Sequence, residues 1–169
     1  MREVVIAGVG QTPVGEHWEL SLRSLAHRAV SAARKDAGDM RPDALYIGNL
    51  LGSVLSHQAN LGSLVAGNSG LEGIEAVTVE AGEASGAGAM RVGYLAVASG
   101  LIDTALVLGV EKYTDAVGPQ TEAAVSQVLD MDYEGMQGLT PSGLAGLVAQ
   151  RYLYETGAPR SALMPFALI

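Results

Sequence analysis

The sequence predicts an α/β fold in which helices cover both faces of a mostly parallel sheet. Short apolar segments rich in β-branched residues alternate with longer segments whose apolar residues recur every three or four positions. The short segments carry few polar residues, as strands buried on both faces do. The 169 residues also include 22 glycines, a content that suits helices packed closely against a sheet.

Four segments have the composition of buried strands. Each is short and apolar, and glycine, proline or polar residues bound it. They are residues 3–9, 43–49, 76–80 and 104–110.

Five segments predict helices. In residues 21–37, apolar side chains repeat at helical spacing, and Gly38 follows as a residue that commonly ends helices. Before this helix, Pro13 and Gly15 favour a loop. The other predicted helices are residues 59–68, 84–99, 122–129 and 144–154.

The character of the chain changes after Glu111. The segment from there to Met136 is more polar than the preceding one, so we predict a first α/β domain over residues 1–112 and part of a second domain, the loop domain, over residues 113–169. The final nine residues, SALMPFALI, have strand character, but nothing follows to pair with them. We therefore expect the chain to end within its architecture.

Composition excludes several classes of function. The chain has 18 acidic and 10 basic residues, a net charge of −8, and no cluster of basic residues to meet nucleic-acid phosphates. It has no cysteine, which excludes disulfides, thiolate metal sites and a cysteine nucleophile. We see no signal peptide and no apolar run long enough for a membrane span, so we expect a cytoplasmic protein.

Three tempting motifs fail on their spacing. GVGQTPVG, residues 8–15, misplaces the third glycine of a dinucleotide fingerprint and has Pro13 where a helix should open. GEASG, residues 82–86, has its serine in the fourth position and not in the third, as a nucleophile elbow requires. DMDYEG begins like a calcium loop, but Pro141 stands where the loop needs an acid.

The segment VEAGEASGAGAM, residues 79–90, is the most specific in the chain. It predicts a buried strand, a tight turn and a helix of very small residues, with Glu83 at the junction. A helix N-terminus carries unpaired N–H groups and partial positive charge, so a negative group is stabilised there.

Four segments that together cover nearly the whole chain are specific in their order and spacing: REVVIAGVGQTPVG, ALYIGNLLGSVLSHQANLGSLVAGNSGL, VEAGEASGAGAMRVGYLAVASGLIDTALVLGVEKYTD and GLTPSGLAGLVAQRYLYETG. In this order they resemble the N-terminal portion of a thiolase, closest to the sterol-carrier-type and archaeal acetyl-CoA acetyltransferase branch. The resemblance implies a layered α/β/α fold with a mixed five-stranded sheet, followed by the start of the family's loop domain. It also implies that the small-residue helix is buried between two layers of sheet.

The resemblance places Glu83 where the family has its nucleophilic cysteine. Thiolases hold a thiolate there, which attacks an acyl-CoA thioester. A carboxylate is a far weaker nucleophile toward thioesters, and its acyl derivative would be a mixed anhydride. The family's second cysteine and its active-site histidines belong to the C-terminal half, which this chain does not reach.

The resemblance also implies ligands and partners. Coenzyme A thioesters are the expected ligands, with no covalently bound cofactor, no metal and no assigned CoA-binding residue. The segment between Val77 and Ala81 matches the strand through which thiolases dimerise, so we expect a homodimer or hetero-oligomer. A polypeptide corresponding to the thiolase C-terminal half and a small zinc-containing OB-fold protein are the further candidate partners, and we expect neither nucleic acid nor membrane.

Glu83 leaves three hypotheses open, and the question whether the chain is an enzyme stays open with them. In the first, which we favour, the chain is a non-acylating subunit or one half of a split, oligomeric thiolase-like assembly. In the second, it is a cysteine-independent C–C bond lyase in which Glu83 acts as acid or base during a retro-aldol or decarboxylation step. In the third, it is a fragment of an active acyltransferase whose cysteine was replaced; a purely structural subunit is the rival to all of these.

The residues near Glu83 have structural interpretations as well. We expect Ser85 to cap or pack the helix, and Gly82 and Gly86 to permit close backbone approach. Glu111 and Lys112 follow a strand at the edge where open α/β sheets bind ligands, although a surface ion pair is the commoner outcome. Of the histidines we expect structural or surface roles; the hypothesis that His57 approaches a dimer partner's site rests on its position after the second strand.

Overall fold

The computed structural model describes residues 2–167 and divides the chain into two compact units, Met1–Val117 and Gly118–Ile169. The first unit therefore ends a few residues beyond the boundary that we predicted after residue 112. It holds the sheet and the segment around Glu83.

The sheet of the first unit has three parallel strands in the order β2-β1-β3. The central strand, β1 (Ala44–Gly48), pairs with β2 (Glu75–Val79) from Ala44 opposite Glu75, and with β3 (Ala105–Gly109) from Ala44 opposite Ala105. Parallel neighbours require crossover connections, which the intervening helices supply. Three of the predicted strands are thus confirmed. The prediction that the strand before Glu83 is buried is wrong, because β2 lies at an edge of the sheet and is exposed or half-buried along its length, whereas β1 is buried throughout.

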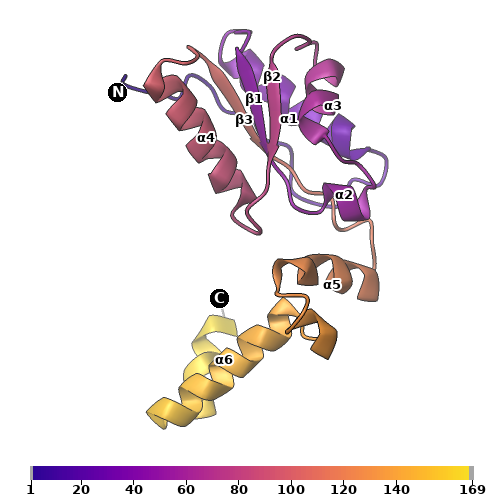
Figure 1. The fold of residues 1–169 in the computed structure, drawn as a ribbon, viewed down its shortest axis with the longest axis vertical. Helices are drawn as coiled ribbons and strands as arrows, with labels where there is room; N and C mark the ends of the chain where they lie inside the picture. Colours follow the sequence, from indigo (N-terminus) through magenta and orange to yellow (C-terminus); the bar gives the residue numbers. More distant parts are fainter. Residues whose placement is uncertain (1, 168–169) are drawn as a thin grey trace. The chain divides into compact units, whose positions relative to one another are not determined.

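Helices cover both faces of this sheet (Figure 1). On one face, Ala44 and Tyr46 of β1 pack with Ala89 and Ala96 of α4 (Ser85–Ser99). On the other face, Leu45 and Ile47 of β1 join an apolar cluster from α1 (Leu22–Asp36) and α3 (Leu61–Asn68); its helical members are Leu22, Ala26, Val30, Leu61, Val65 and Ala66. Alternate residues of the central strand therefore enter two different cores, and the layered α/β/α architecture is confirmed.

Local signals set the ends of these helices. At the start of α1, the Ser21 hydroxyl accepts a hydrogen bond from the Ser24 N–H at 3.3 Å, as an N-cap does. At the end of α4, Gly100 adopts the left-handed conformation with φ 82°, which glycine enters without strain. A single-turn helix, α2 (Gly52–Leu55), follows β1.

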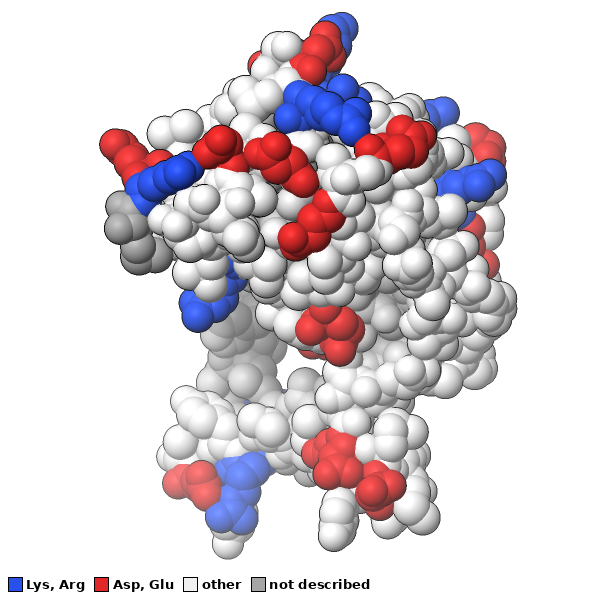
Figure 2. All heavy atoms as spheres, turned by 45° about the horizontal axis from the view of Figure 1, so that its top comes forward, with Lys and Arg blue, Asp and Glu red and all other residues white. Residues whose placement is uncertain are grey.

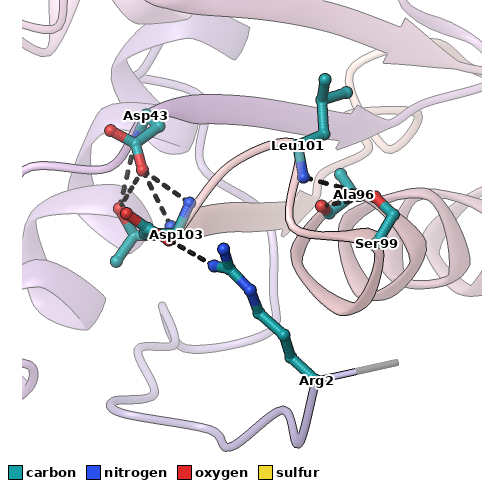
Figure 3. A network of polar contacts seen from close by, with 7 residues as sticks. Arg2, Asp43, Ala96, Ser99, Leu101 and Asp103 are labelled. Carbon is teal, nitrogen blue, oxygen red and sulfur yellow. Dashed lines mark hydrogen bonds and ion pairs between the residues drawn. The ribbon is translucent and has the colours of Figure 1, made fainter.

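The strand predicted for residues 3–9 is wrong: this segment has irregular backbone, and Val5 and Ile6 are 75% and 77% exposed. Contacts hold both of its ends. Arg2 donates from its backbone N–H to the Ala98 carbonyl at 2.9 Å and forms an ion pair of 2.5 Å with Asp103 (Figure 3), and the Val9 N–H donates to the Asp36 carboxylate. β-branched composition favours a strand only where a neighbouring strand supplies the hydrogen-bond ladder, and here none is adjacent.

The number of strands also differs from the prediction of a mixed five-stranded sheet. Within residues 2–167 the sheet has three strands, all parallel. The two missing strands are those predicted at the two ends of the chain. Neither of these segments forms a strand, because neither has a pairing partner among the described residues. The α/β class and the layering are unaffected.

The second unit is helical. It contains α5 (Pro119–Val125), a 3₁₀ turn at Ser126–Val128, another at Gly135–Gln137, and α6 (Pro141–Thr156). The Thr140 side chain caps α6 by accepting the Gly143 N–H at 3.1 Å, and Gly157 ends it at φ 65°. Both helices predicted here are confirmed, and each begins earlier than predicted because a proline occupies its first turn.

The strand character of the last residues is not realised either. Residues Arg160–Ala167 form a 3₁₀ helix, and the rest of the predicted strand lies outside the described residues. Local i to i+3 hydrogen bonds satisfy the backbone there in place of a ladder.

Candidate functional site at the carboxyl ends of the strands

The turn between β2 and α4 carries the segment that the sequence singles out. The Ser85 hydroxyl, buried at the start of α4, accepts the Ala81 N–H at 3.0 Å and donates to the Gly82 carbonyl at 2.6 Å. Gly82 has φ 58°, a conformation that favours glycine. Ser85 therefore fixes the shape of this turn, as its predicted structural role requires, and its hydroxyl is engaged on both sides.

Glu83 lies on the exposed outside of this turn, immediately before α4. In the part of the chain that the structure describes, its carboxylate has no hydrogen-bond or ion-pair partner. The first-turn N–H groups of Gly86 and Ala87 also lack partners there, as is usual at a helix N-terminus. Glu83 thus stands in the turn directly before the helix terminus, with its carboxylate open to solvent and not hydrogen-bonded to these donors.

The close approach at this site is made by the end of β1. A Cβ built on Gly48 would lie 2.5 Å from the Ser85 carbonyl carbon and oxygen, and 2.6 Å from the Gly86 Cα. Strand and helix therefore meet backbone to backbone, which explains the glycine in β1. Gly86 itself has open space around its Cβ position, so the prediction that Gly86 is needed for close approach is wrong, and the requirement falls on Gly48.

The helix that carries the site is covered by one sheet only. Among residues 2–167, the sheet covers the face of α4 that includes Ala89, Gly93 and Ala96, while Met90 and Tyr94 on other faces are exposed. A Cβ on Gly93 would come within 2.7 Å of Val107, so this helix lies close to the strands. The second sheet layer that the resemblance implies is not formed by the residues that the structure describes.

Asn49 connects the three strand ends and was missed by the sequence analysis. Its backbone N–H donates to the carbonyl of Val79, the last residue of β2, its side-chain amide donates to the Val110 carbonyl just after β3 at 2.8 Å, and its Oδ1 accepts the Gly52 N–H at 3.0 Å. It is 6% exposed. The side-chain amide of Asn49 thereby joins the end of β3 to the start of α2, and its backbone N–H joins β1 to the end of β2. The signal in the sequence was a polar residue directly after an apolar strand.

Glu111, beyond β3, binds the same loop. Its half-buried carboxylate accepts the N–H groups of Leu50 and Leu51, the latter at 3.2 Å. Burial raises the pKa of the Glu111 carboxyl, and the two backbone hydrogen bonds oppose that rise. Glu111 therefore orders the loop that follows β1 and forms no pair with its neighbour Lys112.

Lys112 pairs with Asp115, and the Lys112 side chain is only 7% exposed. The Lys112 ammonium is therefore paired with a carboxylate of the same unit. The expected surface ion pair of the Glu111–Lys112 dipeptide is thus replaced by two separate contacts, one to a loop and one within the following turn.

The histidines take structural or surface positions. His27 contacts the hydroxyls of Ser69 and Ser31, at 3.1 and 3.3 Å, and His17 contacts the Pro13 carbonyl. His57 is exposed, with φ 50°, in the loop after α2. The approach of His57 to a partner's site concerns a second chain and stays a hypothesis.

Among residues 2–167, no three His, Cys, Asp or Glu side chains are grouped so that they could hold a metal ion. None of the helices described there has both the length and the apolar character of a membrane span. On the face shown in Figure 2, basic side chains are interspersed with acidic ones and form no continuous basic surface.

Comparison with known proteins identifies the family. The family model described as "Thiolase, N-terminal domain" matches residues 4–169. Two curated archaeal proteins named acetyl-CoA acetyltransferase align over the whole chain: the Methanothermobacter thermautotrophicus protein at 39% identity and the Methanocaldococcus jannaschii protein at 42%. The chain spans 44% and 43% of their lengths.

A third relative and a solved structure add breadth. Benzoylsuccinyl-CoA thiolase subunit BbsB of Thauera aromatica is 33% identical over 93% of this chain and 40% of its own. The crystal structure of 3-oxoacyl-[acyl-carrier-protein] synthase III from Aquifex aeolicus VF5 matches with a TM-score of 0.54 and 21% identity, covering 61% of this chain and 33% of that one, and it supports the fold alone. The family model matches nearly the full chain, and the parallel sheet with helices on its faces is consistent with that match. The chain therefore belongs to the thiolase family.

Proposed function

We propose that this chain is the N-terminal half of a thiolase-like assembly that binds coenzyme A thioesters and does not itself form an acyl-enzyme. The observation that carries the proposal is Glu83. The chain contains no cysteine, and we take Glu83, in the turn just before α4, to stand at the position of the family's nucleophile. A carboxylate in that position keeps the favourable interaction with the helix terminus and lacks the nucleophilicity of a thiolate.

Exposed apolar side chains on α4 and β2 support the proposal that a further polypeptide packs against this chain. The side chains of Met90 and Tyr94 on α4 and Val77 on the edge strand β2 are 53%, 48% and 42% exposed. Apolar surface of this kind marks interaction sites. Val77 lies in the segment up to Ala81 that we predict to form the dimer interface, and α4 offers its uncovered face to the part that the longer relatives possess.

The relatives support a thioester ligand and a multi-chain arrangement. Two are named acetyl-CoA acetyltransferase, and the third is named a subunit of a CoA-thioester thiolase. The present chain corresponds to less than half of each, so binding of acyl-CoA is proposed for the assembly.

Isothermal titration with acetyl-CoA and acetoacetyl-CoA tests the proposal on the assembled protein. We expect binding without a covalent acyl adduct in intact-mass spectra of this chain. Glu83→Gln removes the charge at the site, and Glu72→Gln, at an exposed carboxylate after Leu71, is its matched control.

We expect Glu83→Gln to change thioester affinity and Glu72→Gln to leave it unchanged. Absence of binding by the assembly would reject the proposal in favour of a structural subunit. Turnover of β-keto or β-hydroxy acyl-CoA that is lost in Glu83→Gln would replace it by the lyase hypothesis.

A further inference from the structure

Glu111 belongs to the connection that leaves β3, and it holds the loop that leaves β1. Its Oε1 atom accepts the N–H groups of Leu50 and Leu51, and its Oε2 atom lies 3.2 Å from the same Leu51 nitrogen. The residue before it contacts the same loop, since the Val110 carbonyl accepts the Asn49 side-chain amide at 2.8 Å. Two successive residues after β3 therefore bind three successive residues after β1.

The loop held in this way begins next to the turn that carries Glu83. The Asn49 N–H donates to the Val79 carbonyl at 3.2 Å, and the turn starts directly after Val79. On the other side of Asn49, Gly48 lies against the backbone of the first turn of α4. Because these are backbone contacts, a shift of the loop changes the surroundings of Glu83 and cannot be absorbed by rotation of a side chain.

A carboxylate suits the position of Glu111 better than a neutral side chain. Both of its oxygens contact the Leu51 N–H, whereas a glutamine would set its NH₂ group against that donor. Hydrogen bonds to an ionised carboxylate are also about twice as strong as neutral ones.

The same charge carries a cost in folding stability. Burial raises the pKa of the Glu111 carboxyl, so the ionised form is disfavoured in the folded chain. The neighbouring cation, Lys112, is paired with Asp115. A charge that is retained where it lowers stability is common at functional sites.

We propose that Glu111 is a positioning residue for thioester binding: by holding Leu50 and Leu51, it sets the loop after β1 against the turn that carries Glu83. The inference rests on the proposed function, because it names the residue that keeps the proposed site in its binding geometry. Open α/β sheets bind ligands at the loops beyond the carboxyl ends of their strands. Glu111 joins two of the three such loops here and acts on the ligand through them.

Asp43 provides a matched control at the opposite edge of the sheet. Its carboxylate also accepts two backbone N–H groups, those of Asp103 and Thr104, at 3.1 and 2.9 Å. These residues precede β1 and β3, so this contact lies at the starts of the strands and the Glu111 contact lies beyond their ends. Glu111→Ala and Asp43→Ala each take one carboxylate away from two N–H groups, but only the first does so at the site.

Isothermal titration of the assembled protein with acetoacetyl-CoA compares the variants. We expect Glu111→Ala to weaken binding about tenfold and Glu111→Gln, which keeps one acceptor, to weaken it less. We expect Asp43→Ala to leave the affinity unchanged. Thermal midpoints of all three variants report their loss of folding stability, so a change in affinity is compared with a known change in stability.

Nuclear magnetic resonance of this chain tests the contact itself. Between pH 3 and 7 we expect the amide resonances of Leu50 and Leu51 to shift with one common midpoint, above the ordinary glutamate pKa of about 4.3, as Glu111 loses its proton. In Glu111→Gln this common titration disappears, while the amides of Asp103 and Thr104 still report Asp43.

The outcomes separate the inference from the proposed function. Equal thioester affinity in the wild type and Glu111→Ala overturns the inference and leaves the proposed function standing. An equal loss of affinity in Asp43→Ala does the same, because it assigns the effect to folding stability. Amides of Leu50 and Leu51 that do not titrate with Glu111 also overturn the inference. No binding by the wild-type assembly rejects the proposed function and the inference together.

Discussion

At the scale of single residues, the site depends on contacts between backbones that leave no room for a side chain. Gly48 ends the central strand against the first turn of α4, and Asn49 next to it joins all three strand ends. Glu83 is set beside this junction by the turn that Ser85 holds. The chemistry proposed for position 83 therefore depends on residues that do not themselves meet a ligand.

Gly48→Ala tests this contact. Its Cβ would meet backbone atoms of Ser85 and Gly86 that cannot move as a side chain can, so we expect a loss of about 1–3 kcal/mol in the free energy of unfolding. Gly67→Ala in α3 is the control, because its Cβ would enter open space, and we expect it to be neutral or to stabilise by about 0.5–1 kcal/mol. Urea unfolding of both variants makes the comparison; equal effects would contradict the packing argument.

Tyr46 gives a pH-dependent test of the α4-side core. Its hydroxyl donates to Glu75 at 2.9 Å, and burial, followed by the Glu75 hydrogen bond, raises the pKa of Tyr46 to about 12. Since the folded-state pKa exceeds the unfolded value near 10, its contribution to stability is complete below pH 10 and is lost as the pH rises toward 12. We expect Tyr46→Phe to lose less stability than the wild type across this window, as measured by urea midpoints at pH 9, 10 and 11; parallel pH profiles would count against the Tyr46 environment described here.

At the scale of secondary-structure elements, the starts of β1 and β3 are tied by one carboxylate. Asp43 accepts hydrogen bonds from the backbone N–H groups of Asp103 and Thr104, at 3.1 and 2.9 Å, and from the Thr104 hydroxyl (Figure 3). These bonds fix the turn that feeds the edge strand. The register between β1 and β3 thus has a side-chain tie at its beginning and the Asn49 tie at its end.

Asp43→Asn tests the first of these ties. The bonds from Thr104, and then from Asp103, hold the pKa of the Asp43 carboxyl below its ordinary value. A depressed folded-state pKa contributes stability above the unfolded pKa, and that contribution is lost as the pH falls through the folded value. We expect the variant to be less stable than the wild type at pH 6 and to lose less on acidification from pH 5 to pH 3, in thermal unfolding by circular dichroism; an unchanged acid profile would refute the tie.

Much of the architecture follows from local pattern, and the failures have a common cause. The apolar runs correctly predicted β1 and β3, because the strands with which both pair lie within the chain. The spacing of apolar residues by three or four positions correctly predicted α1. Residues 3–9 show the same composition and form no strand, since pairing depends on a neighbour that local sequence does not contain. The same limit hid the site contacts: Glu111 bonds Leu50 and Leu51, about 60 positions away in sequence, and no local signal reports such a contact.

At the scale of the whole molecule, the chain is two compact units. The buried residues of both apolar clusters, from Leu22 to Leu108, belong to the first unit. The exposed apolar side chains of α4 and β2 belong to it as well. The stability that these two clusters contribute is therefore a property of the first unit.

Truncation after Val117 tests this division. We expect the shortened chain to keep its far-UV circular dichroism per residue in the α/β range and a thermal midpoint within a few degrees of the longer chain, because its cores are intact. Calorimetry of both chains makes the comparison. Loss of cooperative unfolding in the shortened chain would show that Gly118–Ile169 contributes to the first core.

The exposed position of Glu83 has a practical consequence in a chain without sulfhydryl groups. A Glu83→Cys variant would carry one thiol, on a solvent-facing turn beside unpaired helix donors, and alkylating dyes would have a single point of attachment. Fluorescence from a dye at that point would report directly whether a second polypeptide or a thioester binds near the N-terminus of α4.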